Sequence, residues 1–121
     1  MSFKRIAVST VIVLLALEFG LAGLAKFRPG STWPQMFLAW GFPPWVRPVI
    51  GTLEVIGAVG LLIARTRAWA CGVLLGVMAG AIATHLVHGE MRRVILPFVL
   101  SVLLGLVGFL WCRASDLRSQ P

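Results

Sequence analysis

Four long apolar stretches divide the chain and decide what it can fold into. They cover about residues 6–27, 46–64, 68–88 and 94–112 and hold few charged side chains. A helix that crosses a bilayer needs about 20 mostly apolar residues, and in lipid the backbone must satisfy its own hydrogen bonds. The sequence therefore predicts an all-α integral membrane bundle of four transmembrane helices, in a single domain over residues 1–121.

The composition excludes the common soluble classes. Hydrophobic residues make up 59% and charged residues 12% of the 121 residues. A soluble domain is about 45–50% apolar and about 25% charged, and a domain this small cannot hide the excess apolar surface. In a soluble protein the net charge of +7 would suggest a nucleic-acid partner. Here the Lys and Arg residues border the apolar stretches, as anchors to lipid headgroups do, so no nucleic acid is expected.

Charge and tryptophan orient the bundle. Four spans put both termini on one side of the membrane, where six Lys and Arg residues collect against five on the other side. Positive residues favour the cytoplasm, so both termini are expected to be cytoplasmic, in a bacterial-type inner membrane. The tryptophans that we expect to be interface anchors are Trp33, Trp40 and Trp45 on one side, and Trp69 and Trp111 on the other.

Residues 28–47 form the one long connection. Its apolar residues at helical spacing are Trp33, Met36, Phe37 and Trp40. This pattern predicts a short helix near residues 32–40 with one apolar face. Such a helix lies in the membrane interface or caps the bundle. Two interpretations stay open: an apolar segment resting on lipid, or a lid over a pocket.

Ionisable side chains inside a membrane are costly and are candidates for function. The spans hold Glu18, Glu54 and His85, and Lys26 ends the first span. A rise of about 1.5 Å per residue places Lys26, Glu54 and His85 near the same membrane surface. Glu18 falls near the midplane. We therefore predict an intramembrane polar site in which Glu54 faces the interior and meets Lys26 or His85.

Two interpretations of this group stay open. As a working site, it would bind a polar headgroup or relay protons. As a structural clasp, Glu54 and Lys26 would lock the first two spans together, because buried ion pairs often serve specificity more than stability. Taken alone, Lys26 fits a snorkelling anchor, while His88 and Glu90 fit solvated loop residues. No residue can be assigned a catalytic role.

Small residues let membrane helices pack closely. The glycines predicted to pack the helices are Gly51, Gly57, Gly72, Gly76 and Gly80. No metal site is predicted, because His85 and His88 lack a third ligand of suitable type. Cys71 and Cys112 are too far apart in the sequence for a CxxC redox pair. No cofactor is evident from the residues themselves.

Several motifs follow one another in a fixed order between residues 16 and 89. They are Gly23-Leu24-Ala25-Lys26 at the end of the first span, Gly41-Phe42-Pro43 before the second, Gly51-Thr52-Leu53-Glu54 within it, the basic turn Arg65-Thr66-Arg67, and Met78, Ala81 and His85 in the third. In order and spacing they resemble the DoxX family. The resemblance implies a four-helix membrane bundle. It also implies an accessory or anchor subunit of a membrane redox system, related to thiosulfate and quinone or to oxidative stress.

The same resemblance bears on ligands and partners. A quinone is compatible with it, and the chain could be a subunit of a quinone-linked oxidoreductase without a catalytic constellation of its own. The expected partners are the lipid bilayer and a membrane or peripheral redox protein. A homo-oligomer is left open.

A second resemblance gives the alternative function. Small multidrug-resistance exporters are four-helix chains of this size, with a Glu in the first helix and a Lys eight residues later, as Glu18 and Lys26 are. A buried Glu can exchange protons for cationic drugs. The lack of Tyr, the second Glu at position 54 and the Trp-rich loop do not fit this class. A proton-coupled exporter is therefore the runner-up.

Overall fold

The computed structural model describes residues 2–119, with side chains through Ala114, and within them the chain is helical, without strands. The helices are α1 (Phe3–Ala25), α2 (Trp33–Ala39), α3 (Val46–Leu62), α4 (Arg67–Val87) and α5 (Ile95–Ser119). Two short 3-10 turns, η1 (Ala64–Thr66) and η2 (Met91–Val94), precede α4 and α5. The all-α class predicted from the sequence is confirmed, and α5 continues beyond residue 112, where the fourth stretch was expected to end.

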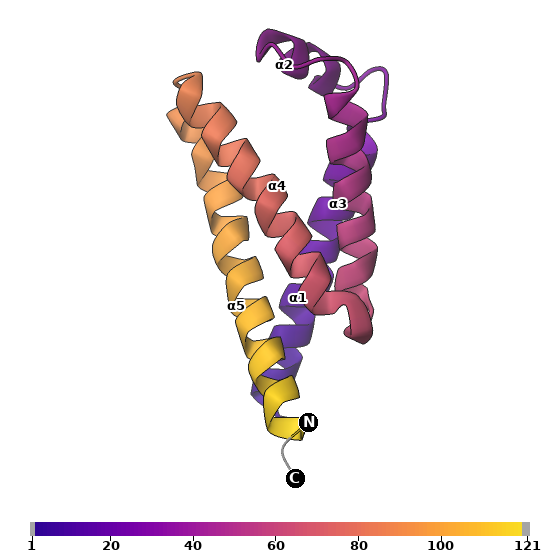
Figure 1. Cartoon of the computed structure of the whole chain (residues 1–121), viewed down its shortest axis with the longest axis vertical. Coiled ribbons are helices and arrows are strands. Elements are labelled where there is room, and N and C mark those ends of the chain that lie inside the picture. The colour runs from indigo at the N-terminus through magenta and orange to yellow at the C-terminus, as the bar shows by residue number, and fades with distance from the viewer. Residues whose placement is uncertain (1, 120–121) are drawn as a thin grey trace.

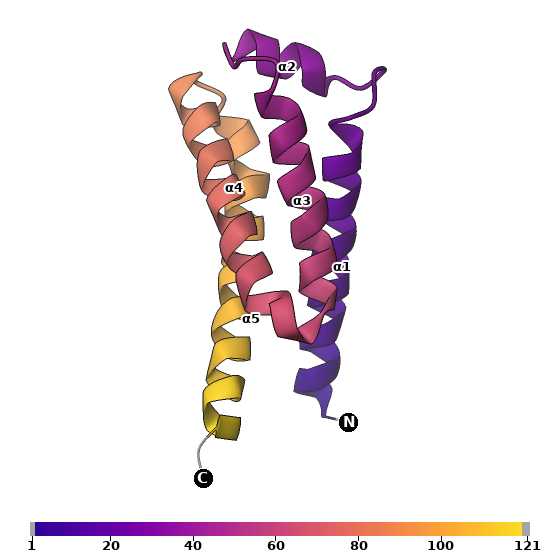
Figure 2. The ribbon, with the colours of Figure 1, turned by 45° about the vertical axis from the view of Figure 1, so that its right-hand side comes forward.

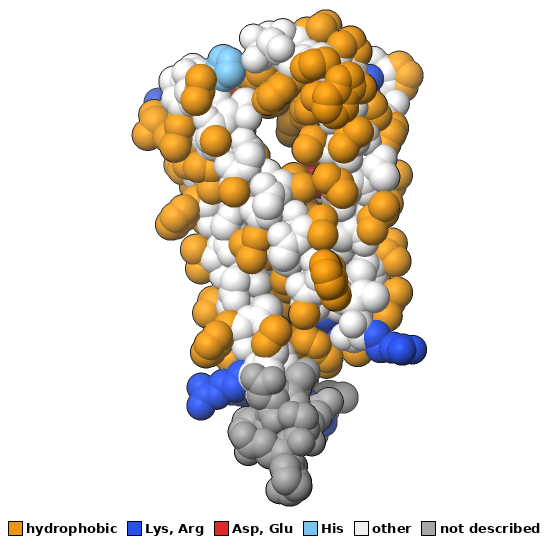
Figure 3. Space-filling model, in the orientation of Figure 1, with side chains coloured by type: hydrophobic (Ala, Val, Ile, Leu, Met, Phe, Trp, Pro, Cys, Tyr) orange, Lys and Arg blue, Asp and Glu red, His pale blue; other side chains and the backbone are white. Residues whose placement is uncertain are grey.

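Three segments of the described chain are long and apolar enough to cross a membrane. They are Phe3–Ala25, Ala64–Val87 and Met91–Ala114. Helix α3, with 17 residues, is shorter. Large apolar side chains are exposed along the described part of the long helices (Figure 3). Because water would not tolerate so much apolar surface on a small monomer, the chain is an integral membrane protein.

The long helices form two pairs that diverge. Helix α1 runs along α3, α4 runs along α5, and α3 packs against α4, whereas α1 and α5 barely touch. The pairs lie close together where α3 passes through η1 into α4, and they separate toward α2 and the turn between α4 and α5 (Figures 1 and 2). Helix α2 lies across that wide end (Figure 2). The short helix predicted near residues 32–40 is therefore present.

The buried core fills the narrow half of the molecule. Its fully buried large side chains are Phe19, Leu61, Leu74 and Leu104, one from each long helix. Hydroxyl side chains within the helices bond backward to carbonyls one turn earlier, as Thr52 does to Pro48 and Ser101 to Pro97. These bonds satisfy polar groups that lipid could not. The wide half has no such core, which leaves room beneath α2.

Candidate functional site: a cavity beneath α2

A cavity of about 490 Å³ lies between the diverging helix pairs, beneath α2. The hollow is visible on the side of the molecule, between α4 and the segment of α2 and α3, with an acidic side chain inside it (Figure 3). Most of its wall is apolar, and the polar or charged side chains that line it are Glu18, Lys26, Glu54, Thr84, His85 and Arg93. This size suits a small organic ligand.

One wall of the cavity begins where α1 and α3 cross at two glycines. A Cβ atom at Gly23 would come within 2.7 Å of the Gly51 carbonyl oxygen, and one at Gly51 within 3.0 Å of the Gly23 carbonyl oxygen. Only glycine allows the two backbones to approach this closely. Lys26 and Glu54 each follow their glycine by three residues, so the crossing brings these two side chains together.

The side chains of Lys26 and Glu54 form a buried ion pair. Lys26 Nζ lies 2.5 Å from Glu54 Oε1, and the two side chains are 6% and 3% exposed. The ammonium group also lies over the Trp33 ring, 3.9 Å from its centroid, in a cation–π contact. Lys26 is therefore not a snorkelling anchor: its stem turns inward because a buried carboxylate and an aromatic face stabilise its charge better than the interface would.

The carboxylate of Glu54 has spare hydrogen-bonding capacity. Within residues 2–114, Lys26 is its one polar partner, and Oε1 is fully buried. An ionised carboxylate can accept about four hydrogen bonds through its two oxygens. Because Glu54 lines the cavity, a ligand in the cavity can donate hydrogen bonds to its carboxylate.

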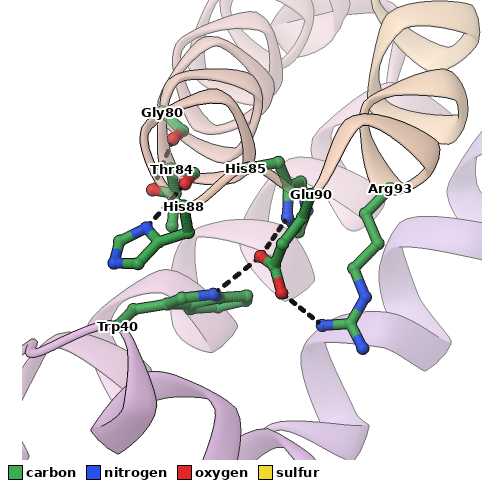
Figure 4. A network of polar contacts seen from close by, with 7 residues as sticks. All are labelled: Trp40, Gly80, Thr84, His85, His88, Glu90 and Arg93. Carbon is green, nitrogen blue, oxygen red and sulfur yellow. Dashed lines mark hydrogen bonds and ion pairs between the residues drawn. The ribbon is translucent and has the colours of Figure 1, made fainter.

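The opposite side of the cavity is organised around Glu90. Its Oε1 accepts hydrogen bonds from Trp40 Nε1 at 2.9 Å and from His85 Nδ1 at 3.1 Å. Its Oε2 accepts a hydrogen bond from Arg93 at 3.0 Å. Figure 4 shows the carboxylate between the indole, the imidazole and the guanidinium. One side chain thus ties the end of α2 to the α4–η2 turn.

Two glycine turns place the partners of this network. Gly41 follows Trp40 with φ +82°, and Gly89 precedes Glu90 with φ +71°. Left-handed backbone of this kind ends helices at low cost only when the residue is glycine. The Glu90 amide then bonds back to the His85 carbonyl at 2.8 Å, which brings the Glu90 side chain beside the imidazole.

Helix α2 therefore forms a roof held at both ends. At its start, Trp33 lies over Lys26, and just after its end Trp40 binds Glu90. Between them, buried Phe37 contacts both indoles edge to face, with ring centroids 6.2 and 5.3 Å apart. Such aromatic pairs add to the stabilisation that burial gives. The lid predicted as one of two interpretations of this loop matches this arrangement.

The sequence model of the DoxX-like family matches residues 10–107 of the chain. The chain belongs to the DoxX-like family. This result confirms the resemblance found in the sequence. No curated protein and no solved structure matches the chain.

The polar residues predicted from the sequence of this DoxX-like protein do not form one cluster. Glu54 meets Lys26, as expected, but His85 does not join them, because it lies on α4 and binds Glu90. Glu18 lines the cavity and has no polar partner among residues 2–114. Glu90 is a partly exposed turn residue, as expected, but its carboxylate binds Trp40, His85 and Arg93. The signal that could have revealed it is Gly89, whose left-handed turn directs the following side chain.

The tryptophans expected to be interface anchors have different environments. Trp45 and Trp69 are 65% and 79% exposed, at opposite ends of the DoxX-like bundle, as anchors require. Trp33 and Trp40 line the cavity instead. The Trp111 ring stacks against the Arg67 guanidinium, 4.5 Å from its centroid.

The glycines also divide into two groups. Gly51 and Gly57 pack tightly, against α1 and Leu74 respectively. For Gly72, Gly76 and Gly80 the predicted packing is wrong, since a Cβ atom at any of them would meet nothing within 4 Å. For Gly76 and Gly80 the physical reason is the divergence of the helix pairs. It turns this face of α4 away from its neighbours, so that Gly76 and Gly80 line the cavity.

Within the described residues, no group of three His, Cys, Asp or Glu side chains is placed to hold a metal ion. Cys71 is buried and Cys112 exposed, and both are free thiols. Among the described residues, the cavity wall of this DoxX-like protein combines apolar surface with the Lys26–Glu54 ion pair, Glu18, His85 and Arg93.

The Glu90 network should make stability depend on pH in one direction. Hydrogen bonds from His85 and Trp40, together with the Arg93 charge, hold the pKa of the Glu90 carboxyl below its ordinary value of 4.5. A lowered pKa means that the carboxylate stabilises the folded state above the unfolded-state pKa, and that this contribution disappears as pH falls through the folded-state pKa. Glu90→Gln should therefore lower the melting temperature at neutral pH, and by progressively less as the pH falls below about 4.

Melting temperatures of both proteins in detergent, measured across this range, check the prediction. The charged and titratable groups that face Glu90 are His85 and Arg93, whereas His88 turns to the Thr84 carbonyl. A difference between wild type and variant that does not shrink as the pH falls below about 4 would show that the Glu90 charge does not hold the roof.

Proposed function

We propose that this DoxX-like protein is an accessory subunit of a membrane redox system, and that its cavity holds a quinone-type ligand. The observation that carries the proposal is the cavity of about 490 Å³, with apolar walls and charged groups at the roof end. A quinone has the matching form, an apolar ring and tail with polar oxygens on the ring. Family membership over residues 10–107 supports the membrane setting.

The proposal includes four transmembrane spans in a single domain. At about 1.5 Å per residue, the 17 residues of α3 extend about 26 Å, and the flanking residues Trp45 and Ile63 lengthen the apolar stretch. A slightly short span is accommodated by local thinning of the bilayer. Helix α2 then lies at the membrane interface, and both termini face the cytoplasm across a bacterial-type inner membrane.

The mouth of the cavity supports entry from the bilayer. It opens between α3 and α4 on the side of the molecule, and its rim on the side of α2 and α3 is apolar (Figure 3). A lipophilic ligand would diffuse in the membrane and enter sideways, beneath α2. The catalytic partner would be another membrane or peripheral redox protein, to be identified by a pull-down in mild detergent.

Filling the cavity tests the proposal. Gly76→Leu places a large side chain in the cavity without a clash at Cβ. Since leucine also favours helix by about 1 kcal/mol over glycine, the variant should fold at least as well as wild type. We expect quinone that copurifies with the wild-type protein to be lost from Gly76→Leu, as measured by solvent extraction and chromatography.

Gly72→Leu is the matched control. It lies one turn earlier on the same face of α4, has open space around it, and does not line the cavity. It should retain the quinone of the wild type. Equal quinone content in all three proteins, or none in wild type even when quinone is added, would contradict the proposal.

A proton-coupled exporter of cations remains the second candidate, favoured by Glu18. Its carboxylate lines a cavity that also has aromatic walls from Trp33, Phe37 and Trp40, and aromatic faces bind organic cations. Uptake of a cationic dye into proteoliposomes, driven by a proton gradient and lost in Glu18→Gln, would favour the exporter over the redox subunit.

A further inference from the structure

The cavity holds several acceptors that have few or no partners. Most of its donor groups already bind one acceptor: Lys26 Nζ contacts Glu54, Arg93 donates to Glu90, and the Thr84 hydroxyl donates to the Gly80 carbonyl at 2.8 Å, although Lys26 and Arg93 keep further N–H groups. Among the lining side chains described, the indole N–H of Trp33 has no acceptor. The acceptors are largely unused, and they lie on three different helices.

His85 supplies the first free acceptor. An ionised carboxylate can only accept, so the His85 Nδ1 atom bound to Glu90 must carry the proton. In the neutral ring, Nε2 is then an acceptor. This nitrogen has no hydrogen-bond partner within residues 2–114 and is not among the fully buried atoms. Because His85 lines the cavity, a ligand can reach it.

Glu54 and Glu18 supply the other free hydrogen-bond acceptors of the cavity. Beyond the Lys26 contact, the Glu54 carboxylate accepts nothing from the described side chains, although its side chain is 97% buried, as its exposed fraction of 3% implies. Buried polar groups are stable when they are hydrogen-bonded and costly when they are not. Glu18, on α1, adds a second carboxylate to the cavity wall. A ligand rich in donors would satisfy these groups.

We propose that the cavity selects the reduced, dihydroxy form of a ring ligand over its oxidised, dione form. This inference rests on the proposed function, since it names which state of a quinone-type ligand the site prefers. Two hydroxyl groups on an apolar ring donate to acceptors such as Nε2 of His85 and the carboxylate of Glu54. The dione presents oxygens that can only accept, and carboxylates repel them.

The test compares three ligands of nearly equal size on the purified protein in nanodiscs, under anaerobic conditions. They are a decyl-substituted 1,4-dihydroxybenzene, its 1,4-dimethoxy ether and the corresponding 1,4-benzoquinone. We expect the dihydroxy compound to bind about tenfold more tightly than either of the others, as one or two net hydrogen bonds would give. This comparison requires no variant, so misfolding cannot obscure it.

Variants then assign the preference to a residue. His85→Phe keeps a ring but removes the Nε2 acceptor, together with one of the bonds to Glu90, and should reduce the preference to about threefold or less. His88→Phe is the control: His88 is exposed, binds the Thr84 carbonyl and does not line the cavity. It should behave as wild type.

The outcomes separate the two proposals. Equal affinities of the three ligands, with binding lost in Gly76→Leu, would overturn the preference for the reduced form but leave the cavity as a ligand site. A preference unchanged in His85→Phe would overturn the role of His85. Absence of binding by all three ligands would overturn the proposed function and this inference with it.

Discussion

Lys26→Met is expected to lower the free energy of unfolding by about 3–5 kcal/mol, the cost of leaving one member of a buried ion pair without its partner. Methionine keeps the length and the apolar stem of lysine, so the loss isolates the charge. The Glu54 side chain would then be 3% exposed with no polar partner among the described residues. Unfolding in detergent, followed by circular dichroism against temperature or denaturant, measures the effect.

Lys4→Met is the control for this substitution. Lys4 lies on the same helix, but it is exposed and takes part in no ion pair of the described chain. Its replacement should change stability by no more than about 0.5 kcal/mol, as exposed positions generally do. If Lys26→Met were equally mild, the pair would not hold α1 to α3.

A double variant separates the structural clasp from the working site. Replacing a buried pair by apolar residues of similar volume is often neutral or stabilising, so Lys26→Met with Glu54→Leu should recover most of the lost stability. Ligand binding then distinguishes the two interpretations. A stable double variant that binds the quinone-type ligand as wild type does identifies a clasp, and one that no longer binds identifies a working site.

The contact between Lys26 and Glu54 could be predicted because it depends on local sequence. Each residue follows a glycine by three positions, and small residues mark the places where membrane helices cross. Counting residues along each span gives the depth of a side chain in the membrane, and this count places Lys26 and Glu54 at the same depth. A crossing and a common depth are sufficient to bring a pair together.

The position of His85 could not be predicted in this way. Counting residues gives its depth but not its lateral position, and the two helix pairs separate most widely at that depth. The divergence depends on how all four long helices pack, which is a property of the tertiary structure. The same divergence explains why Gly76 and Gly80 line a cavity instead of a helix interface.

The environment of Glu90 could not be predicted from the sequence either. A charged residue in a short turn normally faces solvent, and nothing in its neighbourhood in the sequence indicates Trp40, which lies 50 residues earlier. The network forms because α2 folds back across the end of the bundle and brings Trp40 to the α4–η2 turn. The glycines at positions 41 and 89 mark both turns, but their left-handed conformation is visible only in the structure.

Gly23→Ala is expected to move α1 away from α3. This movement should also disrupt the Lys26–Glu54 ion pair. The new Cβ would lie 2.7 Å from the Gly51 carbonyl oxygen and 3.0 Å from the Val55 amide nitrogen. These are backbone atoms, so the helices must move apart instead of a side chain rotating. Overpacking of this kind costs about 1–3 kcal/mol, and Lys26, one turn farther along, would be withdrawn from Glu54.

Gly20→Ala, one turn earlier on α1, provides the contrast. There the new Cβ would meet the Ala58 Cβ at 3.7 Å, an ordinary van der Waals contact. Because alanine favours helix by about 1 kcal/mol over glycine, this variant should melt at or above the wild-type temperature while Gly23→Ala melts below it. Equal melting temperatures for the two variants would mean that α1 and α3 do not cross at Gly23. The placement of Lys26 beside Glu54 would then need another cause, since it is this crossing that carries both side chains to the cavity wall.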